Sequence, residues 1–169
     1  TVASKILPKV GPRWIMVVGL GVASLGMFWL TQIGVNTSFA AHVLPAEILI
    51  SLGMGMAFVP LSSTALHGVS NHDAGVASAM VNTTQQVGGS LGTALLNTLA
   101  ASATAAYVGS HVPGAATVAA GQVHGYSVGA LVGGVILAVA ALAAFLLVKP
   151  GRHDVVATEA VLEPASVPA

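Results

Sequence analysis

Amide and hydroxyl side chains recur along one side of a long uncharged segment, residues 75–103. At about 100° per residue of α-helix, they fall within an arc of about 120°. This polar row consists of Ser78, Asn82, Gln85, Gln86, Gly89, Thr93 and Asn97. Polar groups within an apolar helix must face protein or water rather than lipid. The pattern therefore predicts hydrogen bonds between helices or, alternatively, a substrate pathway lined by Ser78, Asn82, Gln85, Gln86 and Thr93.

A second, weaker stripe lies in residues 43–66, where an acid, hydroxyls and adaptable apolar side chains share one side of the predicted helix. It consists of Glu47, Ser51, Met54, Phe58 and Ser62. This mixture suits a cavity that accepts varied compounds, so Ser51, Met54 and Phe58 join the pathway candidates. Glu47 is the one ionisable group of the stripe. It is a possible proton-coupling acid or, alternatively, an interfacial carboxylate in contact with water.

Four glycines and a proline have structural rather than chemical interpretations. Gly88 and Gly92 lie four apart on a flank of the polar row, a spacing that lets a neighbouring helix approach closely. Gly129 and Gly133 indicate the same kind of packing in a later segment. Pro60 removes a backbone donor, so its helix is predicted to kink there, either as a static bend or as a gate.

The elements that carry these residues are four apolar segments with almost no charge. About 20 apolar residues of helix cross the roughly 30 Å of bilayer hydrocarbon. The segments are residues 14–33, 43–66, 75–103 and 126–148. Charged residues make up 6% of the chain, against about a quarter in soluble domains, so the chain lacks the polar surface of a soluble globule. The predicted fold class is an all-α integral membrane protein with four transmembrane helices.

The cations of the chain flank the first and the last of these segments. Lys and Arg occur only in residues 1–13 and after residue 148, and the three connections contain neither. Because cytoplasmic flanks carry the excess of Lys and Arg, residues 1–13 are predicted to be a cytoplasmic loop, with both ends of the chain cytoplasmic in the cell membrane. Residues 104–125 are expected to form an external loop, and residues 149–169 a disordered cytoplasmic tail. A secretory signal is the alternative for the first segment.

Composition and spacing argue against several other classes. Five Lys and Arg and a formal net charge of zero provide no basic surface for nucleic acid. The six His are scattered, the chain has no Cys, and no nucleophile, base and acid form a catalytic pattern. We therefore expect no enzyme activity, no cofactor and no metal site.

Two stretches resemble a known family. Residues 3–13, ASKILPKVGPR, resemble the second-half copy of the loop motif of the major facilitator superfamily. Residues 74–92, AGVASAMVNTTQQVGGSLG, resemble the penultimate helix of its fourteen-helix drug:proton antiporter branch, with Gln85 where an Arg often stands. The resemblance implies that the segments are the last four helices in the C-terminal half of such a transporter, and that its N-terminal helices are missing from the chain.

The function implied by this resemblance is proton-coupled export of small amphipathic compounds or drugs by alternating access. The implied partners are the lipid bilayer, the missing N-terminal helices, a small-molecule substrate and protons. The first and fourth segments, which lack polar stripes, correspond to peripheral helices in this arrangement. The alternative is a self-standing four-helix membrane anchor or assembly subunit.

Overall fold

Four long helices make up most of residues 12–148, the part of the chain that the computed structural model describes. The elements are α2 (Pro12–Leu30), the short π-helix η1 (Phe39–Val43), α3 (Leu44–Ala65), α4 (Ala74–Gly109) and α5 (Ala115–Leu147). By length and composition, four helical stretches can each cross a membrane. The predicted all-α fold class with four potential spans is confirmed. The predictions of a disordered tail over 149–169 and of a basic loop, apart from its last two residues, lie outside the described residues.

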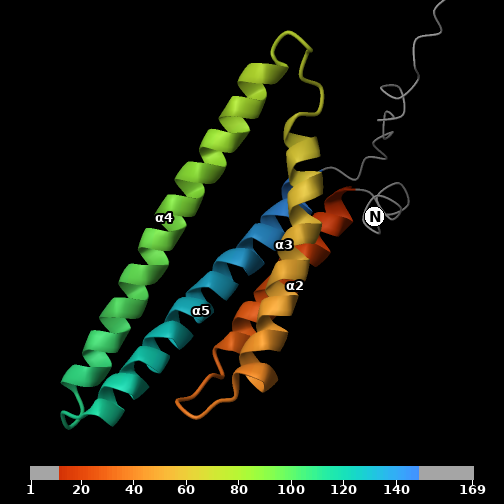
Figure 1. Cartoon of the computed structure of the whole chain (residues 1–169). Helices are drawn as coiled ribbons and strands as arrows, with labels where there is room; N and C mark the ends of the chain where they lie inside the picture. The colour runs from red at the N-terminus through yellow and green to blue at the C-terminus, as the bar shows by residue number, and fades with distance from the viewer. Residues whose placement is uncertain (1–11, 149–169) are drawn as a thin grey trace, which may run out of the picture.

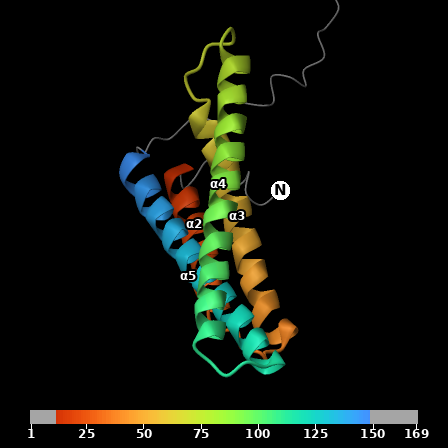
Figure 2. The same cartoon turned by 90° about the vertical axis from the view of Figure 1, so that its left-hand side faces the viewer.

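The helices pack side by side in the order α3, α2, α5, α4 (Figure 1 and Figure 2). The α2–α3 and α4–α5 connections lie at one end of the bundle, and the α3–α4 connection lies at the other (Figure 1). Helix α4 is at the edge. Its C-terminal part packs on α5, whereas its N-terminal part stands clear of the other helices, and none of its residues is buried.

Small residues let α2 and α3 approach closely. A Cβ added to Gly19 would lie 2.6 Å from the carbonyl oxygen of Gly53, and a Cβ added to Gly26 would lie 2.9 Å from that of Ala46. Such close backbones allow the van der Waals packing that holds helices together in lipid, where the hydrophobic effect does not distinguish a helix surface from lipid tails. The α2–α3 pair is thus held by van der Waals contacts, which are possible because the residues at its contact have small side chains or none.

Helix occupies most of the segment that the sequence predicted to be an external loop. Helix α4 ends at Gly109 and α5 begins at Ala115, so the connection is much shorter than the expected 104–125. The prediction ended each helix where the strongly apolar run ends. The flanking segments are rich in Ala, which has the highest helix propensity, and Pro113 lies in the short connection that remains.

The two longest helices exceed the thickness of a bilayer. With 36 and 33 residues, α4 and α5 are about 54 and about 50 Å long at 1.5 Å per residue. The hydrocarbon core measures roughly 30 Å. The paired ends of α4 and α5 therefore extend beyond the hydrocarbon, or both helices tilt strongly within it.

Candidate functional site

The polar row occupies the side of α4 that faces the rest of the bundle. The residues of α4 that lie against glycines of α5 include Leu96, Ala100 and Thr104. In a helix of 3.6 residues per turn, positions five turns apart, about 27 Å along the axis, lie on the same side. Five turns before those three contacts are Ser78, Asn82 and Gln86. The tertiary structure therefore turns the polar row inward.

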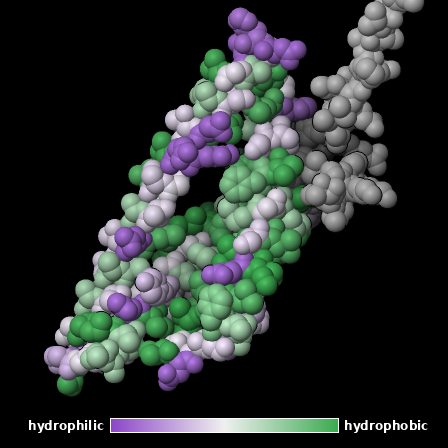
Figure 3. Space-filling view, viewed as in Figure 1, coloured by the Kyte–Doolittle hydropathy of each residue, from purple (hydrophilic) through white to green (hydrophobic). Residues whose placement is uncertain are grey.

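The inward side of α4 borders an opening over its N-terminal part. Asn82, Gln85 and Gln86 are exposed, and within residues 12–148 their amides have no hydrogen-bond partner. Figure 3 shows hydrophilic surface on α4 where that helix borders the hollow between α4 and α3. The amides are therefore open to water, to a solute or to helices outside the described residues.

Hydroxyls on other sides of α4 are satisfied by their own helix. Thr83 donates to the carbonyl oxygen of Ala79 at 2.8 Å, and Thr84 donates to that of Met80 at the same distance. A hydroxyl bonded in this way carries no unsatisfied donor into lipid. The amides of the polar row have no such bonds. They therefore need polar surroundings, which the hydroxyls of Thr83 and Thr84 do not need.

The stripe on α3 lies beside the contact of α3 with α2. The contact side contains the buried residues of this helix: Ala46, Gly53, Ala57 and Pro60. In the stripe, Ser51 and Phe58 are exposed and Met54 is half-buried. The stripe is thus available to a ligand or to further protein, because α2 does not cover it.

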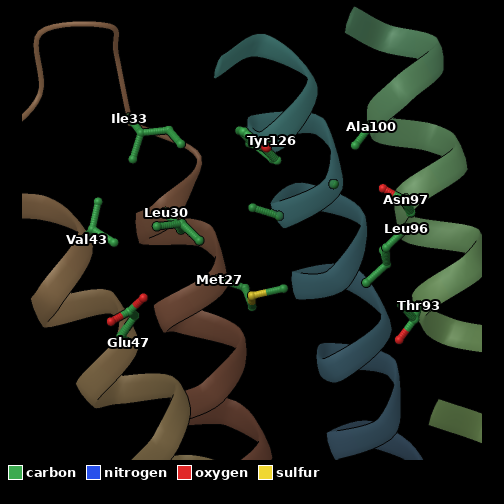
Figure 4. A pocket seen from close by; sticks show the side chains of 12 residues that line it. Met27, Leu30, Ile33, Val43, Glu47, Thr93, Leu96, Asn97, Ala100 and Tyr126 are labelled. Carbon is green, nitrogen blue, oxygen red and sulfur yellow. The ribbon is translucent and has the colours of Figure 1, made fainter. Parts of the chain in front are cut away.

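An open cleft of about 700 Å³ lies at the end of the bundle where α2 ends and α3 begins. All four long helices contribute to it (Figure 4). Met27 of α2 and Tyr126 of α5 lie in the middle, with Glu47 of α3 on one side and Thr93 and Asn97 of α4 on the other. The structure therefore brings the predicted acid together with two residues of the polar row.

The other pathway candidates lie outside this cleft. They are Ser51, Met54, Phe58, Ser78, Asn82, Gln85 and Gln86. The four candidates on α4 are closer to its N-terminus, where the helix leans away from the bundle. The three on α3 lie farther along that helix than Glu47, away from the cleft end. The inward surface of the bundle therefore has two parts. One is the cleft, which has walls on four helices, and the other is a more open polar side.

A row of glycines in α5 provides the contact with α4 and, at its last position, also contacts α2. Gly121, Gly125, Gly129 and Gly133 recur every four residues. A Cβ on Gly125 would overlap the carbonyl oxygen of Ala100, and all four glycines lie against side chains or backbone of another helix. The prediction covered only the last two glycines of this row. Their regular spacing through residues 121–133 was the sequence signal for the whole contact.

Gly88 and Gly92 have different surroundings. Within residues 12–148, a Cβ added at either position would have no neighbouring helix within 4 Å. The predicted close approach needs a helix from outside the described residues, and it stays a prediction.

Pro60 is fully buried and lies within α3, which continues past it. The Ser63 hydroxyl donates to the Pro60 carbonyl oxygen at 3.1 Å.

Contacts between α2 and α5 are a part of the bundle geometry that the sequence did not reveal. The Ser24 hydroxyl donates to the carbonyl oxygen of Gly134 at 2.8 Å across 110 positions of sequence. At the other end of α2, the Arg13 guanidinium lies 4.2 Å from the ring centroid of Phe145. No local spacing pattern connects residues so far apart in the chain.

Aromatic and imidazole rings gather where α4 and α5 extend toward their connection. The ring of Tyr107 stacks on that of His111 at 4.1 Å between centroids, and it lies 5.3 Å from that of His124. Within the described part of the chain, no three His, Asp or Glu side chains are grouped to hold a metal ion. The cluster is therefore interpreted as packed rings.

Apolar helices that can each cross a bilayer, with amides turned toward the interior of the bundle, define a multi-pass membrane protein. The chain belongs to the Major Facilitator Superfamily, whose sequence pattern matches residues 1–93. The resemblance seen in residues 3–13 and 74–92 is thereby confirmed. The superfamily consists of transporters rather than enzymes, and its members act in the membrane on small molecules.

Three relatives show which members of the superfamily are similar to the chain. A puromycin resistance protein of Streptomyces alboniger is 45% identical over 149 residues, which cover 86% of this chain and 30% of the relative. A cephamycin export protein of Amycolatopsis lactamdurans is 34% identical over 99 residues, 59% of this chain and 20% of the relative. A lincomycin resistance protein of Listeria innocua is 30% identical over 104 residues, 62% of this chain and 22% of the relative.

The chain spans less than a third of the length of each of these relatives. No solved structure matches the chain. The matches therefore identify the family of these helices, while the activity of a whole transporter belongs to the proposal that follows.

Proposed function

We propose that these helices form part of the second half of an exporter of small amphipathic compounds, with the substrate path along the inward side of α4. The observation that carries this proposal is the polar row. Its amides Asn82, Gln85 and Gln86 point toward the bundle but have no hydrogen-bond partner within residues 12–148. At membrane depth such groups require water, a polar solute or a polar partner on another helix. The names of the relatives, which refer to puromycin, cephamycin and lincomycin, support drugs as the class of compound.

Alternating access explains why the inward side of α4 is open. In transporters built from repeats, the substrate binds near the bilayer midplane between two halves of the protein. Helices of the other half would face the polar row across the hollow beside α4. The proposal includes coupling to protons, and Glu47 is the candidate acid that the described spans offer. Both ends of this chain would lie on the cytoplasmic side, in agreement with the positions of its Lys and Arg.

A self-standing four-helix anchor is less well supported. The family consists of transporters, and a helix that serves only as an anchor has no need for amides on an unpaired inward side. Interhelical packing by helices outside the described residues is the competing explanation of the polar row that an experiment must exclude.

The test compares substrate selectivity with stability in the protein expressed from its complete gene. Gln86→Leu and Asn82→Leu should change the relative transport of two substrates several-fold while the melting temperature moves little, because an amide exposed to water has no buried partner to lose. Thr84→Val is the matched control, since this hydroxyl bonds to its own helix on another side of α4. It should leave the ratio of substrates unchanged.

The opposite result would assign the polar row to helix packing. In that case both Leu variants would melt at a markedly lower temperature and lose transport of every substrate in proportion. Selectivity and stability should be measured on the same preparation, so that a loss of folded protein is not mistaken for a change in transport.

A further inference from the structure

A positively charged corner lies where α2 begins and α5 ends. The guanidinium of Arg13 lies 4.2 Å from the ring centroid of Phe145 and 6.0 Å from that of Trp14. The two rings meet edge to face, with 5.8 Å between their centroids. The faces of aromatic rings attract a cation, so these contacts hold the long Arg13 side chain in place. These three residues are called the α2–α5 corner below.

The described helices do not neutralise the guanidinium of this corner. Its Nε is buried without a hydrogen-bond partner, and Arg13 forms no ion pair within residues 12–148. The two acids of that part of the chain lie elsewhere. Glu47 lines the cleft at the opposite end of the bundle, and Asp73 accepts a hydrogen bond from Ser70 in the connection before α4. A guanidinium carries a full charge and five N–H donors, so this one requires an acceptor from another molecule or from water.

The two tryptophans of α2 indicate the depth of the corner in the bilayer. Trp14 and Trp29 are both about half exposed and lie near the two ends of the helix. Tryptophan is enriched at both membrane–water interfaces. The 19 residues of α2 measure about 28 Å, close to the roughly 30 Å of the hydrocarbon core. We therefore expect Arg13, next to Trp14, to lie at the level of the lipid headgroups.

The two flanks that adjoin this corner contain all the Lys and Arg of the chain. These residues are Lys5, Lys9, Arg13, Lys149 and Arg152. Because Trp14 and Phe145 are in contact, the two flanks start from neighbouring points of the bundle. Acids enter the second flank only at Asp154. Basic segments next to a membrane span attract anionic lipid, and basic pockets between spans bind its headgroups.

We propose that the α2–α5 corner binds an anionic phospholipid, with the lipid phosphate on the guanidinium of Arg13. A planar guanidinium holds a phosphate through two parallel N–H donors, which gives the contact a defined geometry. Phe145 fixes the guanidinium, and the exposed ring of Trp14 packs against the upper part of the lipid. The site is independent of what the protein carries, so it does not rest on the proposed export.

Quenching of tryptophan fluorescence measures which lipid lies beside the corner. The chain has two Trp, so Trp29→Phe leaves Trp14 as the reporter and Trp14→Phe leaves Trp29. The purified 169-residue chain is reconstituted in equal mixtures of phosphatidylglycerol and phosphatidylcholine, with one lipid or the other brominated in its acyl chains. Trp14 should report about fivefold stronger binding of phosphatidylglycerol. Trp29, at the other end of α2, should report no preference.

Three substitutions, with Trp14 as the reporter, separate a positioned guanidinium from positive charge in general. Arg13→Gln should remove most of the preference. Phe145→Leu keeps every charge but removes the ring that holds the guanidinium, so the preference should fall about twofold. Asp73→Asn is the matched control, because it raises the net charge by one without touching the corner, and it should leave the preference unchanged. Fluorescence is normalised for each variant to bilayers without bromine.

Equal quenching of Trp14 by the two lipids, or a preference that survives Arg13→Gln, would overturn the proposal. A preference that rises with Asp73→Asn and ignores Phe145→Leu would also overturn it, because the lipid would then follow the general charge of the surface. Displacement of the lipid by millimolar inorganic phosphate would instead assign the corner to free anions. Circular dichroism establishes that each variant is folded, and the comparison of Trp14 with Trp29 stands even if Arg13→Gln fails to fold.

Discussion

A polar side chain in this bundle affects either stability or binding, according to whether its hydrogen-bond partner lies within the bundle. Ser24 is the buried polar residue of the described core, 4% exposed, and its hydroxyl ties α2 to α5 through the Gly134 carbonyl oxygen. Glu47 and the amides of the polar row lack partners within residues 12–148. The first kind of residue should affect stability, and the second kind should affect what the protein binds.

The Ser24 bond gives a test of this distinction. Ser24→Ala removes the donor, but the Gly134 carbonyl oxygen keeps its place in the backbone ladder of α5, so we expect a loss of about 0.6 kcal/mol of stability, the average for such bonds in membranes. Ser24→Val adds volume at a buried position and should cost about 1–3 kcal/mol. Unfolding of the purified chain in mixed micelles with increasing SDS measures both. A larger loss for Ala than for Val would show that the hydroxyl, and not the space, dominates at this site.

At the scale of helices, glycine positions decide which elements pack. The α5 row fits against α4 through Gly121 and Gly125, and it fits against α2 through Gly133, beside Met27. A row with a four-residue spacing drifts by about 40° per step around a helix. One row can therefore begin on one neighbour and end on another, which places α5 between α4 and α2.

Two glycine substitutions distinguish a packed side from an open one. In Gly125→Ala the added Cβ would meet the Ala100 carbonyl oxygen and the Thr104 hydroxyl, so we expect a loss of about 1–3 kcal/mol in the stability of the chain. Gly88→Ala should be neutral or slightly stabilising, because no neighbouring helix lies within 4 Å and Ala favours helix over Gly by up to about 1 kcal/mol. SDS unfolding of both variants compares them directly. Equal losses would mean that the α4–α5 contact is not the one described.

Over the whole molecule, the arrangement of the connections predicts which surfaces face each side of the membrane. Ser38 and Ser110 belong to the α2–α3 and α4–α5 connections, which lie at one end of the bundle (Figure 1). Ser70 belongs to the α3–α4 connection at the other end. The distribution of Lys and Arg predicts that the Ser70 end lies in the cytoplasm. Because the chain has no Cys, a single introduced cysteine can be labelled without background.

Single cysteines at these positions should therefore react differently with a membrane-impermeant maleimide. Ser38→Cys and Ser110→Cys should be labelled in intact cells, and Ser70→Cys should be labelled only after permeabilisation. All three positions are exposed, so a lack of reaction would report on sidedness rather than on burial. Labelling of Ser70→Cys in intact cells would contradict the four-span topology.

Much of the fold follows from local rules that can be applied along the sequence. A bilayer requires about 20 apolar residues of helix for each span and tolerates few charges, so composition alone predicts four helices. The 3.6-residue period likewise places Asn82 and Gln86 on one side of a helix without reference to any neighbour. The end of an apolar run does not mark the end of a helix, and for this reason the predicted loop 104–125 is mostly helical in the structure.

The direction in which each helix side points was decided only by the tertiary structure. Contacts such as Ser24 with Gly134, or Gly125 with Ala100, join residues that no local period relates. Those contacts turn the polar row of α4 toward the bundle, and they bring Glu47 and Asn97 to opposite sides of one cleft. Lipid determines which segments become helices, because each segment meets the bilayer separately. Which helix packs against which depends on the mutual fit of small residues, and that fit is a property of pairs of surfaces rather than of either sequence segment alone.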